Sequence, residues 1–253
     1  IVTGSVTSAQ NIIKCCNQSG LDVEDIVLEP LSSSQAVLSS DEQEVGVVLV
    51  DIGGGTTDVT VYSEGSIVHT AVLALGGNHL THDIAIGLGA PLREAEAIKH
   101  KYGVAMVSMV EEDEMIDVPS VGGRNNRTMK KRVLASIIED RFREIFELIA
   151  HEIEKTPFHT LMASGVVITG GTCIMSGADR LASQVLNLPV RVGYPENISG
   201  LREMIYSPKY ATSVGLVRYG ITSNQGKLNF AGDDTNLFNK VSRRMKDWMQ
   251  DFF

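Results

Sequence analysis

Short apolar runs alternate with longer amphipathic stretches along this chain. Residues 47–50 form an unbroken apolar run, which is typical of a strand buried on both faces. Residues 58–62 alternate as an antiparallel partner strand would, and residues 67–75 predict a third strand of the same meander. Two further strands are predicted at residues 166–169 and 190–192. Strands interspersed with helices predict an α/β fold.

Between the strands, apolar residues recur at helical spacing. Helices are predicted at residues 8–17, 30–38, 79–88, 93–102, 133–155, 179–186 and 210–219. We expect Ser8 to cap the first helix, Gly20 to end it, and a strand to precede it. Residues 25–28 are predicted as a short buried strand and residues 39–44 as an acidic loop. Short strands are expected between residues 104 and 135.

Composition is ordinary for a soluble globular protein. Hydrophobic residues make up 43% and charged residues 21%, and no apolar run reaches the roughly 20 residues that span a membrane. The net charge of −9 argues against a nucleic-acid binder, because such proteins neutralise phosphates. Cys15, Cys16 and Cys173 have neither disulfide-framework nor metal-site spacing, so we expect reduced thiols. An opening Ile1 without an initiator Met favours a fragment that begins inside a fold.

The most specific motif is a glycine-rich turn, Asp-Ile-Gly-Gly-Gly-Thr-Thr-Asp, at residues 51–58. Glycines let the backbone approach an anion closely, and threonine hydroxyls can donate to phosphate oxygens. The expected phosphate-binding residues are Gly53, Gly54, Gly55, Thr56 and Thr57. Asp51 could hold a hydrated Mg²⁺. The alternative is a glycine-rich hairpin that binds nothing.

Two weaker motifs lie elsewhere in the chain. Gly170, Gly171 and Thr172 follow the predicted strand at residues 166–169, where α/β folds bind ligands, although a plain turn has the same pattern. Glu96 and Lys99 lie three residues apart on one helical face, where a salt bridge is the simplest interpretation. No GxxxxGK[ST] sequence is present, so the chain has no P-loop.

Together these motifs resemble the second half of the actin, Hsp70 and sugar-kinase superfamily. In this resemblance residues 51–58 are its second phosphate loop, and residues 170–172 its adenosine loop. Glu96 and Lys99 would contact the nucleoside. The segments at residues 28–30 and 210–220 resemble the two interdomain connectors. Segments not shared with actin or Hsp70, at residues 118–124 and 195–201, are similar to the FtsA family of bacterial cell-division proteins.

The resemblance implies an actin-like (ribonuclease H-like) domain with an inserted small α/β subdomain, a remnant of a first domain and a C-terminal amphipathic helix. The implied parts are 1–44 (first-domain remnant and connector), 45–89 with 156–205 (second-domain core), 90–155 (small subdomain), 206–221 (closing connector), 222–236 (flexible linker) and 237–253 (membrane-targeting helix). The superfamily's first phosphate loop, an Asp-[Leu/Ile]-Gly-[Ser/Thr] hairpin, does not occur in this sequence. We therefore expect this chain to form only one of the two walls of the nucleotide cleft.

The last 17 residues have their own pattern. At about 100° per residue their apolar side chains fall within an arc of roughly 160°, with basic side chains flanking it. The predicted membrane contacts are Leu237, Phe238, Val241, Arg244, Met245, Lys246, Trp248, Met249 and Phe252. From residue 240 onward the net charge is +2, which leaves −11 for the rest of the chain. The alternative is a helix that docks on the body of the protein.

The resemblance implies a cell-division scaffold that binds ATP and Mg²⁺ and polymerises. Its implied partners are the C-terminal tail of the tubulin-like protein FtsZ, met by the small subdomain around residues 133–155, and later division proteins. Its implied place is the cytoplasmic face of the inner membrane at the division site, as a peripheral protein. Any hydrolysis is expected to be weak, with Asp51 organising Mg²⁺ and the attacking water. Alternatives are an MreB-type or pilus-assembly scaffold, or a phosphotransferase or ATPase such as a sugar kinase.

Overall fold

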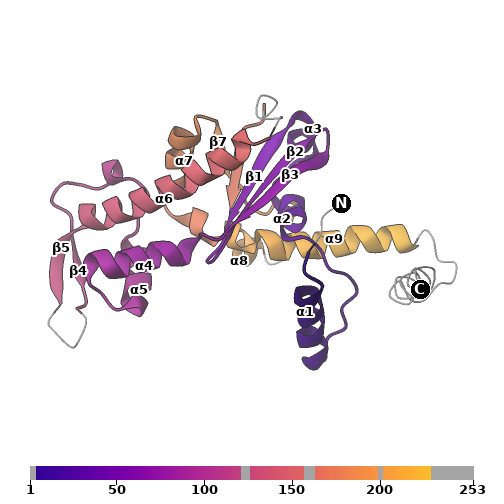
Figure 1. Cartoon of the computed structure of the whole chain (residues 1–253), viewed down its shortest axis with the longest axis horizontal. Helices are drawn as coiled ribbons and strands as arrows, with labels where there is room; N and C mark the ends of the chain where they lie inside the picture. The colour runs from indigo at the N-terminus through magenta and orange to yellow at the C-terminus, as the bar shows by residue number, and fades with distance from the viewer. Residues whose placement is uncertain (1–3, 121–125, 157–162, 199–201, 229–253) are drawn as a thin grey trace, which may run out of the picture. The chain divides into compact units, whose positions relative to one another are not determined.

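A computed structural model describes residues 4–120, 126–156, 163–198 and 202–228. The chain divides into two units, residues 1–218 and 219–253. The first unit contains the sheet, its covering helices and the candidate site (Figure 1).

A five-stranded mixed sheet forms the centre of the first unit, in the order β3-β2-β1-β6-β7. Its strands are β1 (Val47–Ile52), β2 (Thr57–Ser63), β3 (Ser66–Leu73), β6 (Val166–Thr169) and β7 (Val190–Val192). β1 pairs antiparallel with β2 and parallel with β6, and β7 continues the parallel part. The predicted meander and both later strands are confirmed.

β1 is buried along its whole length because both faces of the sheet are covered. Side chains alternate between faces along a strand. Val48, Val50 and Ile52 belong to the larger hydrophobic core, whereas Val47 and Leu49 belong to a smaller core on the opposite face. Asp51 follows the same alternation and lies on the face of the smaller core.

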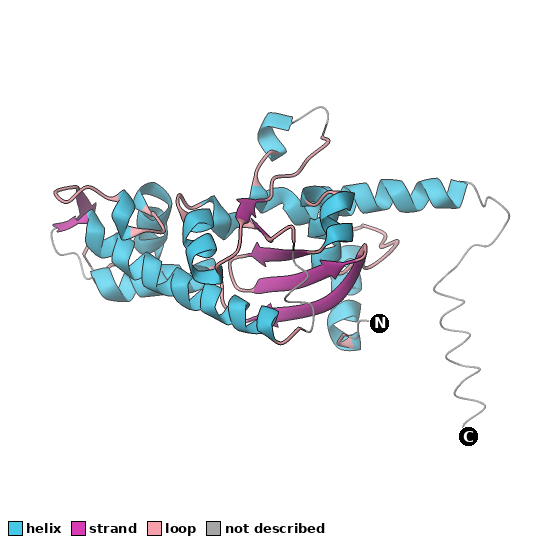
Figure 2. Ribbon diagram, turned by 90° about the horizontal axis from the view of Figure 1, so that it is seen from above, coloured by secondary structure: helices cyan, strands magenta, loops and turns pink. Residues whose placement is uncertain are grey.

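Four helices pack in the larger core: α4 (Gly77–Leu88), α5 (Leu92–Tyr102), α6 (Lys131–Glu154) and α7 (Ala178–Leu186). Figure 2 shows these helices beside the sheet. α6 has the predicted amphipathic pattern, and the rings of Phe142 and Phe146 stack in its buried stripe with centroids 5.6 Å apart. A two-stranded ladder of β4 (Met115–Val118) and β5 (Arg127–Lys130) ends just before α6.

The smaller core is covered by α2 (Glu29–Val37) and by the start of α9 (Ala211–Leu228). α2 begins at Glu29, one residue before the predicted start, and Pro30 fits in its first turn because it loses no helical hydrogen bond there. α9 extends past the predicted end at residue 219 through residue 228. The first part of the predicted linker is therefore helical, and residues 229–236 and the predicted membrane helix lie outside the described residues.

Three predictions near the N-terminus were wrong. α1 (Val6–Gln18) is capped by Ser5 rather than Ser8, since the Ser5 hydroxyl accepts from the Ser8 amide at 3.4 Å. Residues 25–28 form no strand, because among the described residues no strand pairs with this four-residue run. The acidic segment forms a helix, α3 (Ser40–Val45). Its cause is a capping box in which Ser39 and Glu42 satisfy each other's backbone amides.

The remaining elements are short. They are the 3₁₀ turns η1 (Val107–Met109), η3 (Gly171–Ile174) and η4 (Pro208–Tyr210), and the helix α8 (Arg202–Ile205). Within the described ranges, no helix is both long enough and apolar enough to cross a membrane.

Candidate functional site

The glycine-rich turn between β1 and β2 is tied to two other loops. The Gly53 amide donates to the Thr56 carbonyl at 2.9 Å, which closes the turn. The Gly53 carbonyl then accepts from the Gly77 amide at the start of α4 and from the Thr172 hydroxyl in η3, each at 2.9 Å. These bonds bring together segments that are far apart in the sequence.

The close approach of these loops requires glycine at particular positions. A Cβ atom at Gly76 would lie 2.7 Å from the Gly53 carbonyl oxygen, and one at Gly77 would lie 2.6 Å from the Thr172 hydroxyl. Gly170 has a φ of +91°, and its Cβ would lie 2.5 Å from Oδ1 of Asp51. Gly76, Gly77 and Gly170 are therefore needed for backbone packing, whatever ligand binds there, whereas a Cβ at Gly171 would make only an ordinary contact with Lys209 at 3.7 Å.

A cavity of about 550 Å³ opens where these loops meet. Its lining residues are Gly54, Gly77, Asn78, Glu96, Lys99, His100, Gly103, Gly171, Thr172, Ile174, Met175, Ser176 and Lys209. Each of the three motifs predicted to bind a nucleotide contributes to this lining. The volume is in the range of small-molecule sites.

Glu96 and Lys99 form the salt bridge that their spacing predicts, with 2.7 Å between Lys99 Nζ and Glu96 Oε2. The bridge is also tied to α4: Lys99 donates to the Thr81 hydroxyl at 2.8 Å and to the Gly77 carbonyl at 3.1 Å. Thr81 also donates to Glu96. Burial acts to raise the pKa of Glu96, but hydrogen bonds from Lys99 and Thr81 outweigh it, so the pKa lies below its usual value. The pair is thus fixed at the cavity wall in its charged form.

Asp51 lies behind the turn and does not line the cavity. Its side chain is only 6% exposed, and its Oδ2 accepts from the Ser33 hydroxyl at 2.7 Å. Burial raises the pKa of Asp51, and hydrogen bonds from Ser33 and Thr212 oppose that rise. Burial and the charges of Glu29 and Asp51 raise the pKa of Asp58 to about 6. Three carboxyl groups therefore influence one another beside the turn.

The other predicted site residues are placed unequally. Thr56 and Gly55 are exposed at the tip of the turn. Thr57 is fully buried, and its hydroxyl donates to the Leu75 carbonyl at 2.8 Å. The hydroxyl proton of Thr57 is thus already used within the fold, and its expected role as a phosphate donor is replaced by a structural one. Gly170 packs against Asp51 instead of lining the cavity.

Several functional candidates were missed from the sequence. Lys209 and Asn78 line the cavity, but neither lies in a motif that marks it as a binding residue. Glu29 was recognised only as part of a connector, and Asp58 only as the end of the turn. No local pattern could have identified Lys209, because it reaches the cavity from a segment more than 100 residues away from Lys99.

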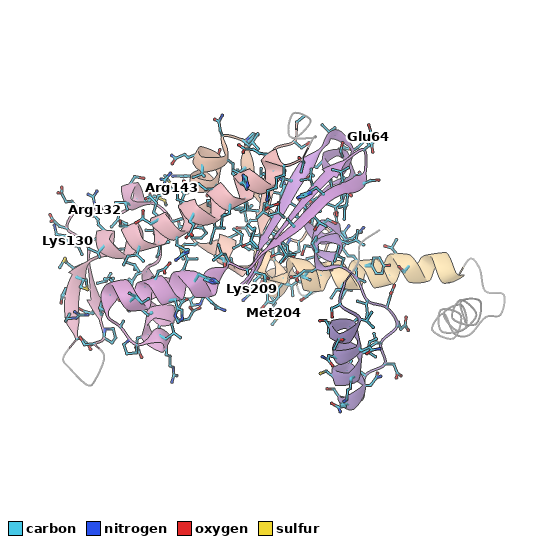
Figure 3. All side chains as sticks on the ribbon, in the orientation of Figure 1. Glu64, Lys130, Arg132, Arg143, Met204 and Lys209 are labelled. Carbon is cyan, nitrogen blue, oxygen red and sulfur yellow. The ribbon has the colours of Figure 1, made fainter. Side chains whose placement is uncertain are left out.

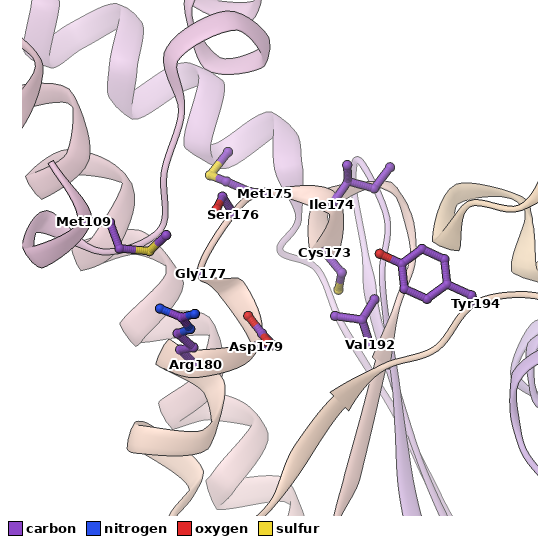
Figure 4. Close-up of a pocket in the computed structure, with 10 residues that line it drawn as sticks. All are labelled: Met109, Cys173, Ile174, Met175, Ser176, Gly177, Asp179, Arg180, Val192 and Tyr194. Carbon is purple, nitrogen blue, oxygen red and sulfur yellow. The ribbon is translucent and has the colours of Figure 1, made fainter.

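A second, smaller cavity of about 250 Å³ shares Ile174, Met175 and Ser176 with the first (Figure 4). Tyr194 and Cys173 also line it. Burial, together with the charge of Asp51, raises the pKa of the Cys173 thiol well above its usual value, so this thiol stays protonated. Across the described part of the chain, no group of three or more His, Cys, Asp or Glu residues is arranged to hold a metal ion directly.

The family model of the cell division protein FtsA matches residues 48–215. The chain belongs to the FtsA family. It is 40% identical to the FtsA of Pseudomonas aeruginosa and 39% identical to that of Escherichia coli K12, in each case over the whole of this chain. It spans 62% of the length of these relatives.

Solved structures with similar folds include MreB5 of Spiroplasma citri bound to ADP, with a TM-score of 0.72 and 18% identity. That match covers 89% of this chain and 68% of MreB5. The ethanolamine utilization protein EutJ of Carboxydothermus hydrogenoformans follows with a TM-score of 0.60 and 23% identity, over 85% of this chain and 62% of EutJ. The predicted actin-like α/β fold is confirmed. The family match favours an FtsA-type protein over the MreB, pilus-assembly and phosphotransferase alternatives.

Proposed function

We propose that this FtsA-family protein is a cell-division scaffold that binds ATP in the cavity between the β1–β2 turn, α5 and η3. The observation that carries the proposal is the convergence on one cavity of three motifs, represented by Gly54, by the Glu96–Lys99 pair and by Thr172. The triphosphate would lie against the turn, where glycines let the backbone approach it. The charged pair would hold the ribose hydroxyls. The MreB5 structures, which hold ADP or AMPPNP, support this ligand class.

Mg²⁺ is proposed to bind through water molecules held by Asp51. Mg²⁺ keeps several waters and takes one or two carboxylates, so the buried carboxylate of Asp51 beside the turn suits indirect binding. When bound, the ion would neutralise phosphate charge. Asp51 would orient the water shell, and if hydrolysis occurs it would orient the attacking water too. The nucleotide is then a means of controlling assembly, and the protein is at most a weak ATPase.

We also propose that the protein polymerises and that it contacts FtsZ, later division proteins and the membrane. The FtsZ tail would meet the small subdomain at the N-terminal end of α6. There Val133 is 41% exposed and is close in sequence to the exposed residues Lys130 and Arg132. Figure 3 shows these two basic side chains at that end of α6. An apolar position flanked by cations suits an extended peptide with apolar and acidic groups. Residues 237–253 would bind the inner membrane from the cytoplasmic side.

The nucleotide site can be tested with Gly54→Val in the full-length protein. A Cβ at Gly54 meets only the Asn78 side chain, at 3.6 Å or more, so the backbone tolerates it, while the added methyl groups enter the cavity. We expect binding of a fluorescent ATP analogue in MgCl₂ to weaken at least tenfold, with an unchanged melting temperature. Gly54→Ala should have a smaller effect, because it adds only the Cβ. Unchanged affinity in Gly54→Val would refute this site.

A further inference from the structure

Hydroxyl groups on two helices, α2 and α9, contact the carboxylate of Asp51. Ser33 of α2 donates to Asp51 Oδ2 at 2.7 Å, and both side chains are buried. The Thr212 hydroxyl, in the first turn of α9, lies 3.0 Å from Ser33 Oγ and 3.4 Å from the same Oδ2. Side chains from β1, α2 and α9 thus form one polar triangle.

The number of protons available fixes the direction of these bonds. Each hydroxyl has one proton, and an ionised carboxylate can only accept. The Ser33 proton is directed to Asp51, so Ser33 can only accept from Thr212. The single Thr212 proton is then shared between Ser33 Oγ at 3.0 Å and Asp51 Oδ2 at 3.4 Å. The Ser33 hydroxyl therefore donates directly to the carboxylate, and Thr212 supports it from the same side, so that the bonds polarise one another.

The two helices that carry the hydroxyls cross without space to shift. The Ser32 hydroxyl donates to the Thr212 carbonyl at 2.7 Å, and Ser32 is fully buried. A Cβ atom at Gly215 would overlap the Ser32 carbonyl. Gly170 closes in on the other carboxylate oxygen, Oδ1. The position of the Asp51 carboxylate is therefore set by packing on both sides.

We propose that Ser33 and Thr212 are positioning residues for Asp51. Their hydrogen bonds hold Oδ2 of Asp51 in place. The other carboxylate oxygen, Oδ1, lies beside Gly170 and would accept hydrogen bonds from the water molecules around the nucleotide-bound cation. This inference rests on the proposed function, since Asp51 has a cation to meet only if the protein binds a nucleotide with Mg²⁺. Neither residue touches the cavity, so their effect should be confined to the part of nucleotide affinity that depends on Mg²⁺.

The test measures the Kd of a fluorescent ATP analogue for the full-length protein in MgCl₂ and in EDTA. The ratio of the Kd in EDTA to the Kd in MgCl₂ reports how much Mg²⁺ strengthens binding. In Ser33→Ala we expect this ratio to fall about tenfold, as for a lost hydrogen bond to a charged group, with an unchanged Kd in EDTA. Thr212→Val, which removes the hydroxyl and keeps the shape, should lower the ratio less. Thr212→Ser should restore it.

Ser34→Ala is the matched control. Ser34 is the next residue of α2 and equally buried, but its hydroxyl bonds with the Leu31 carbonyl and the Tyr62 hydroxyl instead of Asp51. The Ser34→Ala protein should keep the wild-type ratio of the two Kd values even if its melting temperature falls. A wild-type ratio in Ser33→Ala, or an equal loss in Ser34→Ala, would overturn the positioning role. Absence of nucleotide binding in the wild type would instead refute the proposed function itself.

Discussion

At the scale of single residues, the carboxyl group of Asp58 is the clearest case of an unfavourable charge in this fold. It is 8% exposed, and burial and the neighbouring charges of Glu29 and Asp51 raise its pKa to about 6. An unfolded Asp titrates near its ordinary value of about 4. The folded protein therefore binds this proton more tightly, and its stability falls as the pH rises from about 4 to about 6.

Asp58→Asn should remove this penalty. In the absence of nucleotide and Mg²⁺, we expect a higher melting temperature at pH 7.5, for a gain of up to about 3 kcal/mol. At about pH 3 the difference from wild type should vanish, because Asp58 is then protonated in both the folded and the unfolded protein. Asp113→Asn, at an exposed position, serves as the control and should change neither value. A difference between Asp58→Asn and wild type that does not depend on pH would contradict this account.

At the scale of elements, the sequence predicts a segment well when local pattern and tertiary environment agree. The apolar run of β1 indicated a strand covered on both faces, and both faces are covered. Residues 25–28 had a similar pattern but no partner strand. α3 replaces the predicted acidic loop because the capping box of Ser39 and Glu42 starts a helix there, whatever the acidic composition of the segment.

The candidate site was predictable only in part, for a related reason. The glycine-rich turn, the Glu96–Lys99 pair and Thr172 each have a local signature, and all three meet at the cavity. Lys209 has none, because only the fold brings it there. Thr57 shows the opposite error: it belongs to the motif by sequence, but strand geometry turns its hydroxyl toward the Leu75 carbonyl.

The N-terminal end of α6 can be tested as a peptide-binding surface with Val133→Asp. The side chain is 41% exposed, so the fold should tolerate the change, while an apolar contact is lost and acidic charge is added beside Arg132. We expect a synthetic FtsZ C-terminal tail peptide to bind about tenfold more weakly by fluorescence anisotropy. Leu148→Asp, at a 36% exposed position about 22 Å along the same helix, should bind the peptide normally. Equal affinity in all three proteins would exclude this end of α6.

At the scale of the whole molecule, charge is distributed unevenly between the body and the C-terminal segment. The chain carries a net charge of −9, but residues 240–253 carry +2. An acidic body is repelled by anionic lipid, so under the proposed function we expect the basic, apolar C-terminal segment to make the contact with the membrane. A single short amphipathic helix binds lipid weakly, and assembly into a polymer would multiply its effect by avidity.

Removing residues 237–253 from the full-length protein should therefore abolish its binding to vesicles with anionic lipid in a flotation assay, while nucleotide affinity stays unchanged. A double change of Trp248 and Phe252 to Glu provides a version of equal length, since it places two charges within the apolar arc. It should float no better than the truncated protein. If the intact protein lost binding in 0.5 M salt while the double variant still bound at low salt, charge alone would hold the protein at the vesicle surface. Equal flotation of the intact and truncated proteins would place the membrane contact elsewhere in the chain.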